Sequence, residues 1–537
     1  MIGALLAQRA RRDGRQLSMW VVGTAAMAGL GYVGVVSSFA TEQERAALLA
    51  AALANPVILL FRGLPSGAEE ATFIIFLIFP WLAILASMMS LFLAVRHTRG
   101  DEEEGRGELV AATPAGRTLP VIATAAHGII ANSALALLTA AAFVAVGLDP
   151  AGSLIAGGAA AAVGVTFLGV GLLAAQLMRT SRGANALSVW IMLTTFLICG
   201  FGNAIGTPSD DLTRMESSWL TWLSPFGWGE NVRAFSDNLL WPLLLCLALG
   251  GVLSATAILM ASRRDLGESF VAERLGRASA TPALSTSTGL AWRLARGGAL
   301  GWAIGGFLVG VLATTLATVV EEIGAENPSV QEMINQIAGV GDVDQATLTT
   351  FFTMLGVLAA CAGVQVICRA RQEETRGTAE IVLAAPLARV RWLSGYLVVA
   401  FVVVLIVVGA AFVGAAMGIA SQDSSWHLMR DALVTGSGQA VAAFVFAVTT
   451  ALIFTLTPRL TIPLGWALIA FATVLGLFGP VFGLPDWLVH LSPIGVAPIV
   501  SGDEIDARGL WWLAGAVIVG ALAALSLMRQ RELAPAE

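Results

Sequence analysis

Twelve apolar stretches of about 20 residues or more place the tightest limit on what this chain can fold into. A stretch of that length crosses the hydrocarbon core of a bilayer as one helix, whereas an open backbone would leave unpaired polar groups there. Only 12% of the 537 residues are charged, against about 25% in soluble domains. We therefore predict an all-α integral membrane protein whose transmembrane helices cover about 18–38, 72–95, 119–147, 152–178, 185–205, 239–261, 299–320, 349–368, 392–419, 434–457, 461–483 and 510–528.

Two charged segments far apart in the chain share one residue order. Residues 103–117 and 373–389 both read Glu-Glu-x-Arg-Gly, then Glu, an apolar run, Pro, and Arg three residues later, with Thr378 and Ala379 as a two-residue insertion. A second pair, 219–227 and 487–495, reads Trp-Leu-x-x-Leu-Ser-Pro-x-Gly. The pairs predict a tandem duplication: a first six-span half at 1–261, a cytoplasmic linker at 262–288 and a second six-span half at 289–537. Because each half has an even number of spans, the repeats should be parallel.

The arginines predict the orientation of the spans. All 30 basic residues are arginine, and the chain contains no lysine. With both termini in the cytoplasm, 24 arginines fall on the inner side and 6 on the outer side, as the positive-inside rule requires. Each half then begins with a basic amphipathic stretch, residues 5–15 or 289–296. We expect these stretches to lie in the inner interface before the chain turns into the first span.

The second repeated motif falls on the outer side, before the last span of each half. It is too short to span a bilayer but apolar enough to enter the interface as a re-entrant hairpin. Its tryptophans are typical of interfacial anchors. The candidate residues of this outer motif are Trp219, Ser224, Pro225, Gly227, Trp487, Ser492, Pro493 and Gly495.

The first repeated motif predicts a short helix on the inner membrane face. Its paired glutamates favour a helix N-terminus, and its proline ends the helix. A single copy is typical of a solvated charged loop. Two copies with the same order of Glu, Gly, Pro and Arg indicate instead a contact with a cytoplasmic partner.

Missing residue types limit the source of energy for any transport. A phosphate-binding P-loop needs a lysine, so this chain cannot carry one. Proton-coupled transporters place ionisable groups within the membrane, and His127 is the clear candidate inside the predicted spans. We interpret His127 as a polar residue of the bundle, because a proton relay needs partners. We expect no catalytic residue, metal site or cofactor in this chain and no nucleic-acid partner, so the energy should come from another subunit.

The chain resembles the membrane subunit of ABC-2 type transporters. It is similar to their double-length permeases that export polyketide antibiotics of the tetronasin type. The resemblance covers essentially the whole chain and rests on both inner motifs and on residues 222–235, 241–245, 263–267 and 289–296. It implies a pseudo-dimer of two six-span halves in a bacterial plasma membrane. It also implies two copies of a separate ATPase subunit, which would bind ATP and Mg²⁺, and a hydrophobic small molecule as the exported substrate.

The same resemblance implies that the inner motifs are coupling helices, which rest in grooves on the ATPases. It does not identify the residues that bind substrate, and it leaves drugs, polyketides and lipids as alternatives. The residues that it assigns to ATPase coupling are Glu104, Arg106, Gly107, Glu108, Pro114, Arg117, Glu374, Arg376, Gly377, Glu380, Pro386 and Arg389.

Two other classes of function fit parts of the sequence. A secondary drug transporter of the major facilitator type is also a parallel duplication of six spans, but the acid-free spans disfavour it. An integral membrane enzyme acting on lipids would need clustered carboxylates, a histidine or a nucleophile near one interface. The nearest such cluster is Asp503, Glu504 and Asp506, which has no counterpart in the first half.

Overall fold

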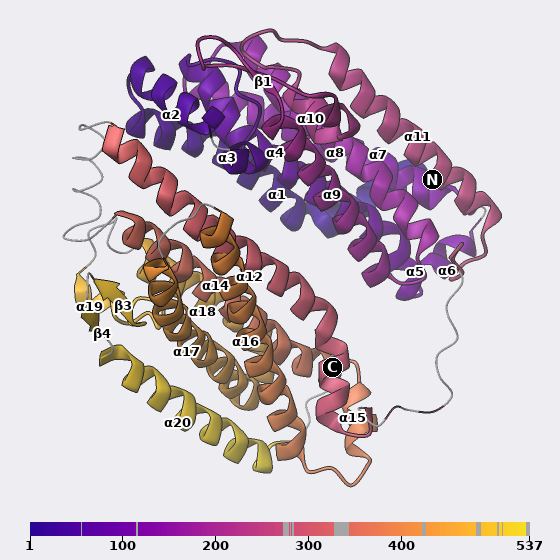
Figure 1. Ribbon diagram of the computed structural model, residues 1–537. Coiled ribbons are helices and arrows are strands. Elements are labelled where there is room, and N and C mark those ends of the chain that lie inside the picture. Colours follow the sequence, from indigo (N-terminus) through magenta and orange to yellow (C-terminus); the bar gives the residue numbers. More distant parts are fainter. Residues whose placement is uncertain are drawn as a thin grey trace. The chain divides into compact units, whose positions relative to one another are not determined.

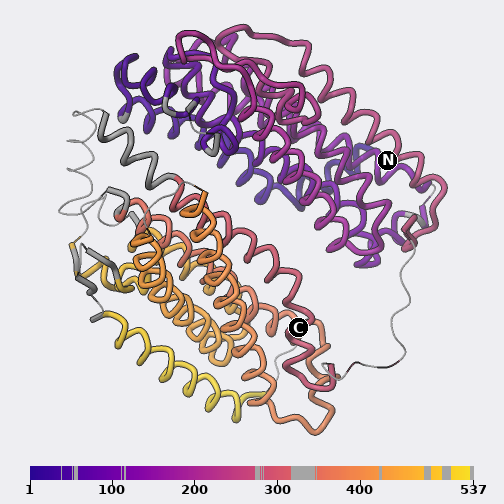
Figure 2. Tube along the Cα trace, in the orientation of Figure 1, coloured from indigo at the N-terminus to yellow at the C-terminus, as the bar shows by residue number. Residues whose placement is uncertain are grey.

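The computed structural model describes residues 1–54, 56–113, 116–271, 279, 281, 284–326, 343–421, 426–478, 485–501, 504–506 and 508–532. The chain forms two compact units, Met1–Leu275 and Gly276–Glu537, shown as a ribbon in Figure 1 and as a trace in Figure 2. Twelve helices of the described residues are long and apolar enough to cross a membrane. The predicted all-α membrane fold is therefore confirmed.

Six long helices build the first unit. They are α1 (Ile2–Ser38), α4 (Glu70–Val95), α7 (Leu119–Ala145), α8 (Pro150–Leu177), α9 (Ser181–Ala204) and α11 (Trp241–Arg263). Helix α8 is the most buried of them and packs against α4, α7 and α11. Small residues allow these close contacts: a Cβ at Gly157 would collide with the carbonyl oxygen of Ala136, and one at Gly169 would lie 2.7 Å from that of Gly250.

Local signals set the ends of these helices. The Asp149 side chain accepts a hydrogen bond from Gly152 N (2.8 Å), and Pro150 takes the first position of α8. The Thr180 hydroxyl caps α9 in the same way through Gly183 N (3.1 Å). Asp and Thr satisfy the free N–H groups of a helix start, and proline fits there because it has no N–H to satisfy.

Shorter elements close the first unit at the end away from the first repeated motif. They are α2 (Glu42–Ala54), α3 (Pro56–Phe61), η2 (Trp219–Leu223) and α10 (Pro225–Glu230). A small antiparallel hairpin pairs β1 (Thr207–Pro208) with β2 (Met215–Glu216), and Thr207 faces Glu216 across it.

The second unit repeats the order of long helices. They are α12 (Ser287–Glu326), α14 (Val343–Thr375), α16 (Arg389–Ser421), α17 (His427–Leu456), α18 (Thr461–Thr473) with its π-helical extension η5 (Val474–Phe478), and α20 (Arg508–Gln530). Helix α12 packs mainly on α16, and α14 on α17. The short elements are α15 (Thr378–Leu383), η4 (Pro458–Leu460), α19 (Asp486–Val489) and an antiparallel hairpin of β3 (Ile499–Ser501) and β4 (Glu504–Asp506).

The basic stretch at the start of each half is not a separate interfacial helix, so that prediction was wrong. Residues 5–15 belong to α1, and residues 289–296 belong to α12. In the first unit, Arg9 Nη2 donates to the carbonyl oxygens of His97 (3.2 Å) and Pro120 (2.9 Å), and Arg12 pairs with Asp101 (2.8 Å). These bonds hold the basic stretch against the ends of α4 and α7, so the helix continues without a turn.

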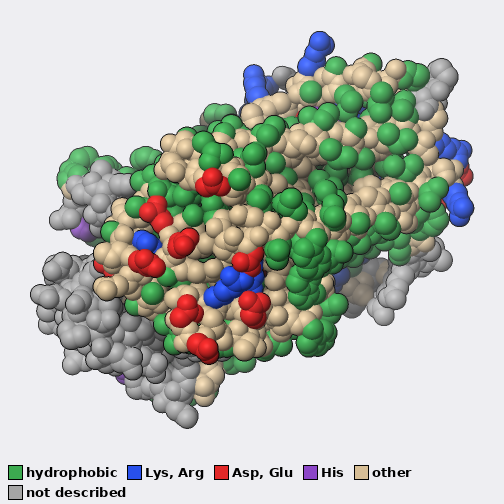
Figure 3. Space-filling model, turned by 90° about the horizontal axis from the view of Figure 1, so that it is seen from above, with side chains coloured by type: hydrophobic (Ala, Val, Ile, Leu, Met, Phe, Trp, Pro, Cys, Tyr) green, Lys and Arg blue, Asp and Glu red, His purple; other side chains and the backbone are tan. Residues whose placement is uncertain are grey.

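The surface of the helices is apolar along much of its length. In the space-filling view of Figure 3, hydrophobic side chains cover much of the right part of the visible face, and charged side chains form a group on its left and central part. Large apolar residues such as Leu137, Leu244, Leu405 and Val519 are exposed on the spans. A lipid environment accounts for such a surface, because water would penalise it.

Candidate functional site

Each copy of the first repeated motif folds as a turn followed by a six-residue helix. In the first unit, α4 continues through η1 (Arg96–Gly100) and α5 (Asp101–Glu103), and α6 then spans Arg106–Ala111. In the second unit, α14 leads directly to the turn before α15. Gly105 and Gly377 stand immediately before the short helices, each with φ of 72°. Glycine adopts this left-handed conformation without strain.

This geometry corrects the register that the sequence indicated. The sequence comparison paired Gly107 with Gly377 and treated Thr378 and Ala379 as an insertion. The structure pairs Gly105 with Gly377, because these two residues share the left-handed conformation before helices of equal length. Thr378 and Ala379 therefore correspond to Arg106 and Gly107. In this register Glu374 matches Glu102, and Arg376 matches Glu104.

A glutamate in each motif is held between two arginines. Glu102 accepts from Arg99 Nη1 (2.7 Å) and from Arg264 Nη2. Glu374 accepts from Arg371 Nη1 (2.9 Å), and both of its carboxylate oxygens accept from Arg531 Nη2 (2.6 and 2.8 Å). The exposed fraction of the side chain is 14% for Glu102 and 1% for Glu374. We call these sets the first clamp (Arg99, Glu102, Arg264) and the second clamp (Arg371, Glu374, Arg531).

Each clamp ties its motif to the end of the last helix in the same unit. Arg264 directly follows α11, and Arg531 directly follows α20. The predicted residues Arg117 and Arg389 add to both connections, because their Nη1 atoms donate to the backbone carbonyls of Arg264 (3.5 Å) and Arg531. One set of contacts therefore recurs in both units, around residues that the sequence had not paired.

Sequence reasoning missed Glu102 and the four clamp arginines. The signal was present as Arg-x-x-Glu at 99–102 and 371–374, and as Arg-acid-Leu at 264–266 and 531–533. The wrong register concealed the first pattern. The second lies just after the last span of each half, in the predicted linker and in the last residues of the second half.

The other predicted coupling residues lie at the surface, beyond the clamps. Arg106 pairs with Asp101 (2.9 Å) and with Glu104. The corresponding residues Leu109 on α6 and Ile381 on α15 are 73% and 76% exposed. Pro114 lies outside the described residues. The remaining exposed members of the predicted set are Glu104, Glu108, Arg376, Glu380 and Pro386. Each short helix thus presents one large apolar side chain directly after a glutamate, a pattern suited to a protein partner.

A buried polar cluster joins α1, η1 and α7 in the first unit. His97 Nε2 is hydrogen-bonded to Asp13 Oδ2, and Arg96 Nη1 donates to Asp13 Oδ1 (3.0 Å). The His127 ring stands edge-on to the His97 ring, with 5.6 Å between ring centroids. Sequence reasoning gave His127 no ionisable neighbour, whereas the structure supplies two from other parts of the chain.

Two imidazoles and one carboxylate are a donor set that could hold a transition metal. One ligand atom each from Asp13, His97 and His127 lies within 4.8 Å of the others. However, Arg96 already pairs with this carboxylate, and Arg9 donates to the His97 carbonyl. Because these two cations repel a divalent ion, we interpret the cluster as a polar network that fixes three helices.

The outer motif is an anchor in both units. The buried Ser224 and Ser492 hydroxyls donate to the carbonyl oxygens of Thr195 (2.7 Å) on α9 and Ala472 (2.8 Å) on α18. Pro225 begins α10, and Pro493 follows Ser492 in a turn. A Cβ at Gly227 would collide with the carbonyl of Thr221, and one at Gly495 would approach that of Val489 to 2.9 Å. Trp219 and Trp487 remain exposed, consistent with interfacial tryptophans.

One titratable group of this anchor has no counterpart in the second unit. Glu230 ends α10, outside the spans, and accepts from Asn203 Nδ2 (2.6 Å) with Cys199 Sγ 3.4 Å away. Burial raises the pKa of Glu230 to about 7. The matching position of the second outer motif is Pro498.

We expect the free energy of unfolding to fall by about 3 kcal/mol as the pH rises from about 4.5 to above 7. The raised pKa means that the fold favours the protonated Glu230 carboxyl. The stabilisation is complete below the pKa of the unfolded chain and is lost as the pH rises through the folded pKa. Unfolding of the purified protein at several pH values checks this. Glu230→Gln should flatten the profile, and the exposed control Glu216→Gln should not; an unaltered profile in Glu230→Gln would refute the assignment.

Comparisons with known proteins agree with this architecture. Residues 284–529 match the family model described as the C-terminal domain of the multidrug efflux system permease Rv1217c. The chain is 32% identical over 531 residues to the multidrug efflux system permease protein Rv1217c of Mycobacterium tuberculosis (strain ATCC 25618 / H37Rv). This similarity covers 97% of the present chain and 93% of the relative. The chain therefore belongs to the family of the multidrug efflux system permease Rv1217c.

Proposed function

We propose that this chain is the membrane-spanning permease of a multidrug efflux system and that a separate ABC-type ATPase drives it. The permease part is supported by the relative and by the twelve candidate spans. The observation that carries the ATPase part is the recurrence of an exposed Leu109 or Ile381 on a short helix clamped to the last span. Two ATPase copies would bind one short helix each and supply the ATP and Mg²⁺ chemistry. The exported molecules would be hydrophobic drugs or polyketide antibiotics.

The clamps indicate how a movement of the short helices, driven by the ATPase, would be transmitted to the spans. Helix α6 lies between α4 and α7 in the chain, so a push on α6 acts on both. The first clamp also connects α11 to the motif, because Glu102 pairs with Arg264, which directly follows α11. In the second unit, α15 lies between α14 and α16, and Glu374 holds Arg531 after α20. Half of the spans in each unit are thereby connected to one short helix.

The two contacts with the ATPases should be unequal. Arg106 and Gly107 in α6 are replaced by Thr378 and Ala379 at the matching positions of α15. Arg106 forms ion pairs with Asp101 and Glu104, and a threonine cannot replace these. The first short helix is therefore the more highly charged docking surface.

The competing functions have weaker support. A secondary transporter would need ionisable groups along a pathway in both halves. The buried cluster of the first unit is not repeated, because Arg369 and Val399 stand where His97 and His127 do in the structural register. For the lipid-modifying enzyme, Glu504 and Asp506 lie on β4, and Asp503 lies outside the described residues. Lipid export by the same ATP-driven mechanism would differ only in substrate.

Energy depletion in cells that overproduce the permease and its ATPase tests the proposal. We expect efflux of a fluorescent drug to stop when ATP is depleted while the proton gradient is kept. A protonophore applied with ATP maintained should leave most of the efflux. The opposite pattern would favour the secondary transporter and refute our proposal.

A further inference from the structure

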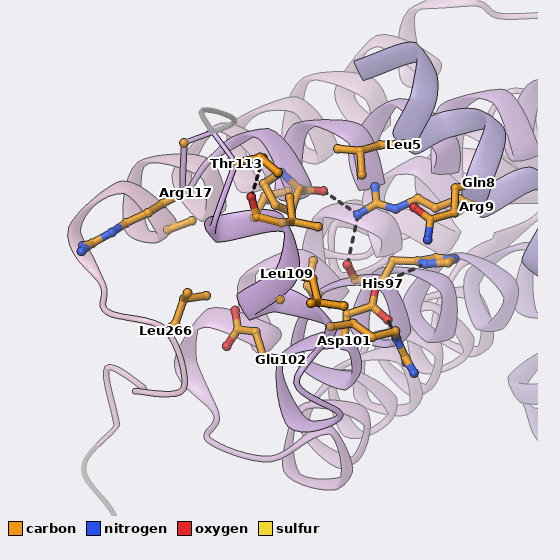
Figure 4. A pocket seen from close by; sticks show the side chains of 18 of the residues that line it. Leu5, Gln8, Arg9, His97, Asp101, Glu102, Leu109, Thr113, Arg117 and Leu266 are labelled. Atoms are coloured by element: carbon orange, nitrogen blue, oxygen red, sulfur yellow. Dashed lines mark hydrogen bonds and ion pairs between the residues drawn. The ribbon is translucent and has the colours of Figure 1, made fainter. Parts of the chain in front are cut away.

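A cavity of about 380 Å³ opens in the first unit beside the first clamp (Figure 4). Its walls come from the start of α1, from the repeated motif around α6, from the start of α7 and from the segment after α11. These elements meet at the end of the bundle that carries the clamp. The volume lies within the range of about 300–1,000 Å³ that small-molecule pockets occupy.

The cavity is amphipathic and carries an excess of positive charge. Five arginines line it, against three carboxylates. Much of the rest of the wall is apolar, with Leu5, Val110, Val121, Ala261 and Leu266 among its members. Such a wall suits a ligand that combines an anionic head with a hydrocarbon part.

The carboxylates are already engaged by the other arginines of the wall. Asp101 pairs with Arg12 (2.8 Å) and Arg106 (2.9 Å). Glu102 pairs with Arg264, and Asp265 pairs with Arg117 (2.9 Å). The three carboxylates of the wall thus pair with its four other arginines, and no carboxylate of the described residues lies within ion-pair distance of Arg9.

Arg9 is a buried cation that forms no ion pair with a carboxylate of the described residues, and Asp101 and Asp13 act on it only at longer range. Its residue is 6% exposed, and its Nη2 donates only to the carbonyl oxygens of His97 and Pro120. Its Nη1 has no hydrogen-bond partner among the described residues. In Figure 4 the guanidinium lies between the Leu5 and His97 side chains at the wall of the cavity. A buried guanidinium in this state gains from a nearby anion, because charge and hydrogen bonds would both be satisfied.

We propose that this cavity binds the phosphodiester headgroup of an anionic membrane lipid, with Arg9 as its principal cation. The apolar residues would contact the glycerol and the upper acyl chains. Arginine is suited to this ligand because its guanidinium forms charge-assisted hydrogen bonds with phosphate oxygens, and Arg9 Nη1 has N–H groups to donate. A bound lipid would connect α1 with α6 and with the segment after α11. The inference concerns the first unit alone and does not depend on the proposed ATPase.

Lipid titration of the purified full chain in detergent tests the site without any ATPase. The melting temperature is followed with phosphatidylglycerol, with phosphatidylcholine of the same acyl chains, and with inorganic phosphate. We expect saturable stabilisation by phosphatidylglycerol only. In Arg9→Gln the apparent affinity for phosphatidylglycerol should fall at least tenfold, whereas Arg11→Gln, an exposed arginine of the same helix outside the cavity, should bind as the wild type does.

A second variant keeps the test decisive if Arg9→Gln does not fold. Leu5→Trp fills the cavity and leaves Arg9 in place, and it too should lose the stabilisation. Equal stabilisation by both lipids would overturn the proposal, as would wild-type affinity in both cavity variants. If inorganic phosphate alone stabilised the protein, the ligand would be a free anion, and the lipid assignment would be refuted.

Discussion

Replacing Glu374 with alanine is expected to lower the free energy of unfolding by about 3–5 kcal/mol, the range for breaking a buried ion pair on one side only. Glu374 pairs with both Arg371 and Arg531 in the second clamp, and its side chain is 1% exposed. Alanine would remove a carboxylate that pairs with both arginines, whose side chains have little access to water. Equilibrium unfolding of the purified protein in detergent measures the loss.

Matched variants separate the clamp from general effects of losing a glutamate. Glu380→Ala removes an exposed glutamate six residues away and should change stability by less than about 0.5 kcal/mol. Glu102→Ala should cost less than Glu374→Ala, because 14% of its side chain remains accessible to water. If Glu374→Ala and Glu380→Ala proved equally stable, the second clamp would be an incidental contact.

The spans were predictable because each depends on a local property. A run of about 20 apolar residues must cross the bilayer as a helix whatever surrounds it. All twelve spans were predicted from this rule alone. The tertiary bonds of Arg9 and Arg12 were not, and these bonds make the basic stretch a continuation of α1.

The candidate site was only half predictable. The repeated order of Glu, Gly, Pro and Arg located both short helices, but identity alone could not say which glycine is left-handed. Gly105 and Gly107 look equivalent in the sequence, and only the backbone shows φ of 72° at Gly105. The clamp was not predictable for a different reason. Arg264 and Arg531 pair with the motif in space but follow the last long helix of their units, far from the motif in the sequence. Two residues that are so far apart in the sequence have no fixed spacing from which a single sequence could predict their contact.

Placing aspartate at both Leu109 and Ile381 is expected to abolish ATPase binding. Each residue is a large apolar side chain at the surface of a short helix, which a hydrophobic groove of a partner can bury. Loss of one such contact costs about 2 kcal/mol or more, which corresponds to roughly 30-fold in affinity. The two sites together should remove stable association. Folding should be preserved, because neither side chain belongs to a clamp.

The matched control carries the same two changes at the other end of the units. Leu223 and Leu491 are also exposed, and they belong to the two copies of the outer motif. Leu223→Asp with Leu491→Asp should leave ATPase binding intact. Each single variant, Leu109→Asp or Ile381→Asp, should show an intermediate affinity. Leu109→Asp should be the less severe, because we propose that the first short helix, which has the additional Arg106, is the more highly charged docking surface.

The most direct test of the account is ATP-dependent drug transport by this chain in lipid vesicles, measured with and without the purified ATPase. We predict transport only when both proteins and ATP are present, and none when the permease carries aspartate at Leu109 and Ile381. Drug transport by the permease alone, or undiminished ATP-driven transport in the double variant, would contradict the account.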